Sequence, residues 1–229
     1  MTMTGVLSSL EILMGRALIK LLTDNWFFFA ALMGILILLK LLSLSKFKGW
    51  FGEAMVNRSL NRLNPENYRC FHDLYLPRPD GKGSTQIDHV VVSPFGIFVI
   101  ETKNYRGWIF GSEKQRQWTQ QIYRRKERFQ NPLHQNLLHV RALMDFLHLP
   151  EERFKPVVFF IGDTQFKTPM PDNVLNNGLR KWLENHRDSL LTSEQVEHAG
   201  TALSTHERNT NRKTAARQHL RDLKCRQAA

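Results

Sequence analysis

The sequence is poor in cysteine and in acidic residues, and both shortages narrow the classes of protein that it can encode. Its two cysteines, Cys70 and Cys225, lie far apart and form no C-x-x-C pair, which excludes a disulfide framework and a zinc ribbon. Reduced, cytoplasmic thiols are the simplest interpretation. The 21 acidic residues are outnumbered by 32 lysines and arginines, and the net charge of +11 favours a polyanionic partner, either nucleic acid or an acidic membrane surface.

One long apolar run stands near the start of the chain. Residues 26–44 read WFFFAALMGILILLKLLSL, in which Lys40 is the only charge. A helix rising about 1.5 Å per residue over this run comes close to the ~30 Å thickness of the hydrocarbon layer. We therefore predict a transmembrane helix at about 26–44. A buried core helix and a signal peptide are the alternatives, because the strictly uncharged part, 26–39, is short for a span.

The residues around this run predict how the anchor is arranged. Residues 5–22 carry an apolar stripe at helical spacing, which is typical of a helix lying in the membrane interface. Basic residues precede and follow the run, and their balance favours a single-pass membrane protein whose C-terminal domain is cytoplasmic. Residues 1–48 are thus interpreted as a membrane anchor, with membrane lipid as a partner.

The rest of the chain alternates between strand-like and helix-like patterns. We predict helices over 51–63, from Pro132, and after Thr192, which forms a capping box with Gln195. The helix from Pro132 is expected to bury Leu133, Leu137, Val140, Met144 and Leu147. The predicted strands are 68–76, 86–92, 96–104, 108–111, 117–123 and 155–162. Such an order implies an α/β domain with a mixed central sheet flanked by helices.

The strands 86–92 and 96–104 carry the candidate site. If they form a hairpin about residues 93–96, opposed residues have numbers that sum to 189, so Asp88 faces Glu101 and Gln86 faces Lys103. Alternation along the strands then places all four side chains on one face, with directly opposed Cβ atoms about 4.5–5.5 Å apart. The sequence therefore predicts two carboxylates within reach of one cation.

Opposed carboxylates destabilise a strand pair, and a bound Mg²⁺ or Mn²⁺ would compensate for their repulsion. These cations prefer oxygen ligands, and Asp88, Glu101 and the backbone carbonyl of Thr102 provide them. Lys103 could orient or help to deprotonate a water molecule. This chemistry suits hydrolysis of phosphodiester bonds. The alternative is that Glu101 and Lys103 form a solvated pair on an outward face.

Two further residues are candidates for the same site. Glu53 lies on the apolar stripe of the helix 51–63, which suggests a third acidic group at the site, although a surface position is an equal alternative. Gln135, near the start of the helix from Pro132, either points towards the phosphate or is an ordinary residue near a helix cap. His72, His89 and His134 lack metal-ligand spacing, and we interpret them as structural or surface residues.

The residues quoted above resemble a known family. Gly52-Glu53, the run QIDHVVVSPFGIFVIETKNYRGWIFG, Trp118 and NPLHQN are similar to the nuclease-related domain (NERD), which is grouped with the PD-(D/E)xK restriction-endonuclease-like superfamily. The resemblance covers about residues 50–165 and implies a nuclease-related domain over 49–165. It also implies Asp88 as the first acid, Glu101 and Lys103 as the E-x-K element, and Glu53 and Gln135 as accessory positions.

The expected function is that of a membrane-anchored, metal-dependent nuclease acting on DNA, with RNA as an alternative substrate. A catalytically inactive nucleic-acid-binding module and a membrane-surface scaffold with the same fold are the competing hypotheses. Residues 166–229 are interpreted as a helical extension with a basic tail, which either contacts phosphates or is a frayed terminus.

Overall fold

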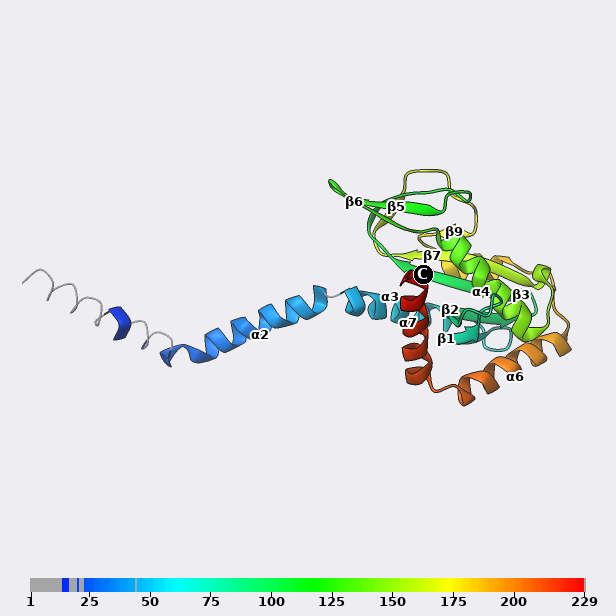
Figure 1. Cartoon of the computed structure of the whole chain (residues 1–229), viewed down its shortest axis with the longest axis horizontal. Helices are drawn as coiled ribbons and strands as arrows, with labels where there is room; N and C mark the ends of the chain where they lie inside the picture. The colour runs from blue at the N-terminus through cyan, green and yellow to red at the C-terminus, as the bar shows by residue number, and fades with distance from the viewer. Residues whose placement is uncertain (1–13, 17–19, 21–22, 44, 229) are drawn as a thin grey trace, which may run out of the picture. The chain divides into compact units, whose positions relative to one another are not determined.

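The computed structural model describes residues 14–16, 20, 23–43 and 45–228 of the chain (Figure 1). The chain divides into two compact units, Met1–Trp50 and Phe51–Ala229. The predicted domain boundaries after residues 48 and 165 stay predictions.

The N-terminal unit contains helix α2, Trp26–Ser43, whose large apolar side chains between Trp26 and Leu39 are exposed. No helix in the described part of the chain is both long and apolar enough to cross a membrane. The transmembrane helix predicted at about 26–44 is therefore not supported. The predicted interfacial helix over 5–22 falls largely outside the described residues.

A five-stranded mixed sheet forms the centre of the second unit. Its strands are β1 (Arg69–Pro77), β2 (Ser84–Ser93), β3 (Gly96–Asn104), β7 (Phe154–Ile161) and β9 (Val174–Leu175). They lie side by side in the order β1-β2-β3-β7-β9, with β1, β2 and β3 antiparallel and β7 and β9 parallel to β3. The predicted mixed sheet is confirmed.

Helices cover both faces of this sheet, which explains why β2 and β3 are apolar on both sides. Helix α3 (Ser45–Leu60) packs Val56 and Leu60 against one face, and helix α4 (Pro132–Leu147) packs Val140 and Leu143 against the other (Figure 1). Odd-numbered residues of β3 face α4 and even-numbered residues face α3, because Ile97 and Val99 join the first core cluster while Phe98 and Ile100 join the second.

Helix α4 is held in a defined position over β3 and β7. The side chain of Asn131 accepts a hydrogen bond from the Leu133 backbone N–H and so caps the helix, and Pro132 occupies its first turn. The buried Asn136 side chain donates to the backbone carbonyls of Val99 and Val157 at 2.9 and 3.0 Å. The first two turns of α4 are therefore fixed over the middle of β3 and β7.

The buried face of α4 differs from the predicted one. Val140 and Leu147 are buried as predicted, but Leu133, Leu137 and Met144 are only partly buried. Their places in the interior are taken by residues that include Asn136, His139 and Leu143. The difference arises because two polar residues make specific buried hydrogen bonds, which an apolar periodicity does not detect.

A second sheet carries the strands that follow β3. It consists of β4 (Gly107–Phe110), β5 (Gln117–Ile122), β6 (Arg125–Gln130) and β8 (Thr164–Phe166), in the order β6-β5-β4-β8. The short strands at 108–111 and 117–123 are confirmed as strands, but they do not extend the central sheet. The basic run that follows residue 123 forms most of β6. Trp118 is fully buried and stacks on Phe160 of β7 with ring centroids 6.1 Å apart, which joins the two sheets.

The C-terminal helices are α5 (Leu179–Asn185), α6 (Ser193–Asn209) and α7 (Arg212–Ala228), and a 3-10 turn, η1 (Glu151–Arg153), precedes β7. The capping box of Thr192 and Gln195 that opens α6 is confirmed. The basic tail is helical, and α7 contacts the start of β2: Asp222 accepts a hydrogen bond from the Ser84 backbone N–H at 3.1 Å.

Candidate active site

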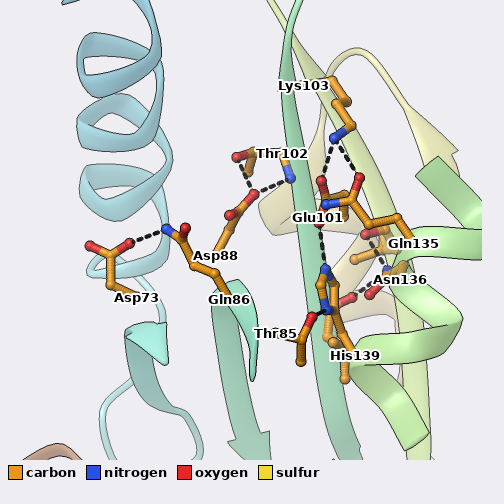
Figure 2. Close-up of polar contacts among 12 residues, drawn as sticks. Asp73, Thr85, Gln86, Asp88, Glu101, Thr102, Lys103, Gln135, Asn136 and His139 are labelled. Carbon is orange, nitrogen blue, oxygen red and sulfur yellow. Dashed lines mark hydrogen bonds and ion pairs between the residues drawn. The ribbon is translucent and has the colours of Figure 1, made fainter. Parts of the chain in front are cut away.

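The strands β2 and β3 pair in the predicted register. Opposed residues run from Ser93 and Gly96 to His89 and Ile100, and their numbers sum to 189 throughout. The regular pairing stops there, one position before Asp88. The side chain of Asp88 then links the strands, because its Oδ2 accepts hydrogen bonds from the Thr102 backbone N–H at 2.9 Å and from the Thr102 hydroxyl at 2.8 Å (Figure 2). Asp88 and Glu101 thus lie at the open end of the hairpin.

The alternation of β2 is interrupted at this point. On β1, Asp73 has a positive φ of 53° and is missing from the otherwise regular pairing with β2. The side chain of Gln86 donates to Asp73 at 3.0 Å, away from Glu101 and Lys103 (Figure 2). Ile87 and Val90 both pack into the cluster under α4, although strict alternation would place them on opposite faces. The prediction that Gln86 shares the face of Glu101 and Lys103 is therefore wrong.

Glu101 is buried, with 1% of its surface exposed, and both of its carboxylate oxygens accept hydrogen bonds. Oε1 accepts from Lys103 Nζ at 2.5 Å, and Oε2 accepts from His139 Nε2 at 3.0 Å (Figure 2). Burial alone would raise the pKa of Glu101. The positive charge of Lys103 and the His139 hydrogen bond outweigh it, so the pKa lies below its ordinary value. Glu101 is therefore ionised at neutral pH.

Lys103 bridges Glu101 and Gln135. Its ammonium group also donates to Gln135 Oε1 at 2.9 Å, so the predicted accessory glutamine lies beside the lysine (Figure 2). Burial favours the neutral amine, but the charge and hydrogen bond of Glu101, together with the charge of Asp88, raise the pKa of Lys103 above its ordinary value. Lys103 is therefore a fixed positive charge.

Asp88 has the opposite electrostatic balance. Burial, followed by the negative charge of Glu101, raises the pKa of Asp88 to about 7, against the lowering effect of its two hydrogen bonds from Thr102 and of the Lys103 charge. The two carboxylates are thus close enough for the charge of one to oppose ionisation of the other. At neutral pH an added cation would favour the ionised form of Asp88.

Glu53 is on α3 and is half-buried. Burial and the nearby charge of Asp73 raise its pKa. Among the described residues, no hydrogen bond links Glu53 to Asp88, Glu101 or Lys103. The structure therefore links Glu101, Lys103 and Gln135 by hydrogen bonds. Asp88 bonds to Thr102 and lies near enough for the charges of Glu101 and Lys103 to shift its pKa, whereas Glu53 is associated with the neighbouring Asp73.

Two further residues, His139 and Thr85, belong to the site although no sequence pattern pointed to them. His139 is buried on α4, its Nε2 bonds to Glu101, and its Nδ1 lies 2.9 Å from the Thr85 hydroxyl. Because an ionised carboxylate only accepts hydrogen bonds, Nε2 carries the proton. One signal could have found it: His139 follows Gln135 by four residues, which puts both on one face of a helix. In the described part of the chain, none of the histidines interpreted as structural or surface residues forms a hydrogen bond with Glu101, Lys103 or His139, although the charge of Glu101 acts on His89.

Within the described part of the chain, no cluster of three or more His, Cys, Asp or Glu side chains is arranged to hold a metal ion. The available donors are two carboxylates and backbone oxygens. Both hydrogen bonds to Asp88 end on Oδ2. Among the described residues, none donates a hydrogen bond to Asp88 Oδ1, so this oxygen can bind a cation. A bound cation would also relieve the repulsion between Asp88 and Glu101. The residues fit a hard divalent ion that keeps several of its water molecules.

The fold and the site define an α/β protein with a carboxylate and lysine site at the open end of a strand pair. A family model for the nuclease-related domain matches residues 48–161. An uncharacterized protein of Bacillus anthracis is 38% identical over 157 residues, which cover 67% of this chain and 74% of the relative. The chain belongs to the nuclease-related domain family, and this membership indicates a nuclease-like function. No solved structure matches the chain.

Proposed function

We propose that the chain is a metal-dependent nuclease that hydrolyses phosphodiester bonds in DNA, with RNA as the alternative substrate. One observation supports this proposal above the others. Asp88 and Glu101 are electrostatically coupled carboxylates at the open end of one hairpin, and the ammonium group of Lys103 lies against Glu101. Such a combination suits a reaction in which negative charge develops on a phosphoryl group.

Asp88, Glu101 and the carbonyl of Thr102 would hold the Mg²⁺ or Mn²⁺ ion. When bound, such an ion polarises a phosphoryl oxygen and makes water a better nucleophile. The protein's own contribution is position and charge. Lys103 is protonated, so it acts as a positive charge beside the phosphate and not as a base. Gln135 and Glu101 together fix the direction of its ammonium group.

His139 is a positioning residue in this proposal. It donates to one oxygen of Glu101 while Lys103 donates to the other, so the carboxylate is held at both oxygens. Thr85 in turn holds the imidazole ring. A carboxylate fixed in this way loses little freedom when a ligand binds, which is the general advantage of a preorganised site.

The test is cleavage of labelled single-stranded, nicked and duplex DNA by the purified full chain with Mg²⁺ or Mn²⁺. Asp88→Asn and Lys103→Met are expected to abolish cleavage, whereas the exposed pair Asp145→Asn and Lys181→Met serves as a charge-matched control with full activity. Equal cleavage by all four variants would refute the proposal. Salt-sensitive binding that is never followed by cleavage would identify the catalytically inactive binding module instead.

The exposed apolar side chains of α2 support a second proposal, that the N-terminal unit attaches the chain to a membrane surface with its C-terminal domain in the cytoplasm. Flotation of the purified full chain with vesicles tests it. Deletion of residues 1–45 is expected to abolish flotation on neutral and on anionic vesicles. Retention on anionic vesicles alone would instead indicate a basic membrane-surface scaffold.

A further inference from the structure

The strands β5 and β6 form a strongly basic ribbon. Residues 114–130 contain six lysines and arginines and one acidic residue, Glu127. The strands pair antiparallel from Gln117 and Gln130 to Ile122 and Arg125, so only Tyr123 and Arg124 connect them. The side chains from Ile122 to Arg128 are all exposed. A two-stranded ribbon of this kind has the width of structures that enter the grooves of nucleic acids.

One face of the ribbon is hollowed and lined by basic and amide side chains. A hollow of about 960 Å³ is lined by Arg116, Gln117, Thr119, Arg128, Gln130 and His134, among others. A second hollow, which includes Lys126, shares Thr119 and Arg128 with it. The hollows therefore run from near the tip of the ribbon to His134 in the first turn of α4. The next residue, Gln135, bonds to Lys103 of the candidate active site.

The positive charges on this face are not neutralised by the protein. Arg125, on the opposite face of β6, forms an ion pair with Glu127. In the described part of the chain, no carboxylate forms an ion pair with Arg116, Lys126 or Arg128. Exposed charges without internal partners are available to an external polyanion, and the amide groups of the lining glutamines can donate hydrogen bonds to phosphate oxygens.

The tip of the ribbon presents an aromatic ring. Tyr123 is 94% exposed and has a positive φ of 52°, which a tyrosine rarely adopts and which glycine or asparagine would adopt at lower cost. An exposed ring held in an unfavourable backbone conformation gains nothing for folding. Next to Arg124 and Arg125, it is placed to stack on a base.

The base of the ribbon is fixed to the strand that carries the active-site residues. Tyr105, two residues after Lys103, packs edge-to-face on Phe129 of β6 with ring centroids 4.5 Å apart. Phe129 also contacts Phe160 of the central sheet. A nucleic acid bound along the ribbon is thereby held at a fixed distance from the two carboxylates.

We propose that the basic face of the β5–β6 ribbon is the docking surface that aligns a nucleic-acid strand with the active site. Lys126, Arg128 and Arg116 bind successive phosphates, and Tyr123 stacks on a base beyond them. The choice of nucleic acid as the partner rests on the proposed nuclease function. The ribbon can bind a nucleic acid whether or not the chain cleaves it, so the docking surface and the nuclease activity can fail separately.

The experiment measures binding of fluorescent single-stranded and duplex DNA to the full chain by anisotropy, without divalent ions, at several salt concentrations. The variant Arg116→Ala/Lys126→Ala/Arg128→Ala is compared with Arg217→Ala/Arg221→Ala/Lys224→Ala, which removes the same charge from α7. The ribbon variant is expected to bind at least tenfold more weakly. Its slope of log K against log salt is expected to fall in magnitude by about 2 to 3, at about 0.9 for each phosphate contact.

Tyr123 allows a test that a folding defect cannot imitate. Tyr123→Gly relieves the backbone strain, so its melting temperature is expected to equal or exceed that of the wild type, while binding to single-stranded DNA weakens about fivefold or more. Tyr123→Phe keeps the ring and should bind normally.

The docking surface would be overturned if the ribbon and α7 variants weakened DNA binding equally, or if the ribbon variant bound DNA as well as the wild type. Either result would count even if the wild type cleaves DNA. Ribbon-dependent binding without any cleavage would support the docking surface and refute the nuclease. Loss of binding to anionic vesicles but not to DNA in the ribbon variant would show that the ribbon serves a membrane, and would also overturn the proposal.

Discussion

Replacing Asp88 with asparagine is expected to stabilise the protein at neutral and alkaline pH while removing metal binding. In the folded protein the pKa of Asp88 is raised to about 7, from an ordinary value of 3.8. An acid with a raised pKa binds its proton more tightly in the folded state than in the unfolded state. The contribution of protonated Asp88 to the free energy of unfolding is therefore complete below about pH 4 and is lost as the pH rises to about 7. Asparagine removes this loss and keeps an acceptor for Thr102.

The magnitude follows from the raised pKa. The gap between 3.8 and about 7, at about 1.4 kcal/mol for each pH unit, corresponds to about 4 kcal/mol. Because Asp88 is half-buried, solvent screens part of this energy, and we expect a gain of about 2–3 kcal/mol at pH 8. For a domain of this size the gain raises the melting temperature by about 4–12 °C.

Thermal melts between pH 4 and 8 with EDTA measure the effect. Asp88→Asn and the wild type should melt together near pH 4 and separate progressively towards pH 8, whereas Asp145→Asn, at an exposed position on α4, should show no such separation. Saturating Mn²⁺ should raise the melting temperature of the wild type and leave Asp88→Asn unchanged. A variant that is less stable than the wild type at pH 8, or that keeps the Mn²⁺ response, would refute the reasoning.

Three other predictions concern the same group of residues. His139→Ala should slow cleavage and lower the free energy of unfolding by about 2 kcal/mol, because the buried carboxylate of Glu101 loses a hydrogen-bond donor. His139→Gln should recover part of the cleavage rate. Equal kcat values for the two variants would contradict a positioning role for His139. Asn136→Ala should lower the free energy of unfolding by about 2–4 kcal/mol in urea titrations, since two buried backbone carbonyls lose their shared donor, and an unchanged midpoint would contradict this. At subsaturating Mg²⁺, single-turnover cleavage should accelerate as the pH rises through about 7, where Asp88 of the metal-free protein loses its proton. A flat profile at subsaturating Mg²⁺ would exclude Asp88 as the group that must ionise.

Local patterns predicted the elements of the domain well because each pattern reflects a local physical cause. The short turn at residues 93–96 set the register of β2 and β3, and the apolar runs on both strands marked them as buried. The caps at Asn131 and Thr192 marked the starts of α4 and α6. The pairing of β2 with β3 ends one position before Asp88, and the hydrogen bonds from Thr102 to Asp88 hold Asp88 beside β3, while Lys103 followed from the alternation of β3.

Long-range contacts decided the rest. The sequence by itself determined the central hairpin, its two carboxylates and the lysine beside them, since these depend on residues fewer than twenty positions apart. The tertiary structure decided that β4, β5 and β6 form a separate sheet, that Asp73 draws Gln86 away from the carboxylates, and that α4 delivers His139 to Glu101. Such contacts depend on which surfaces meet after the elements have formed. Periodicity along one element carries no information about the partner that will cover it.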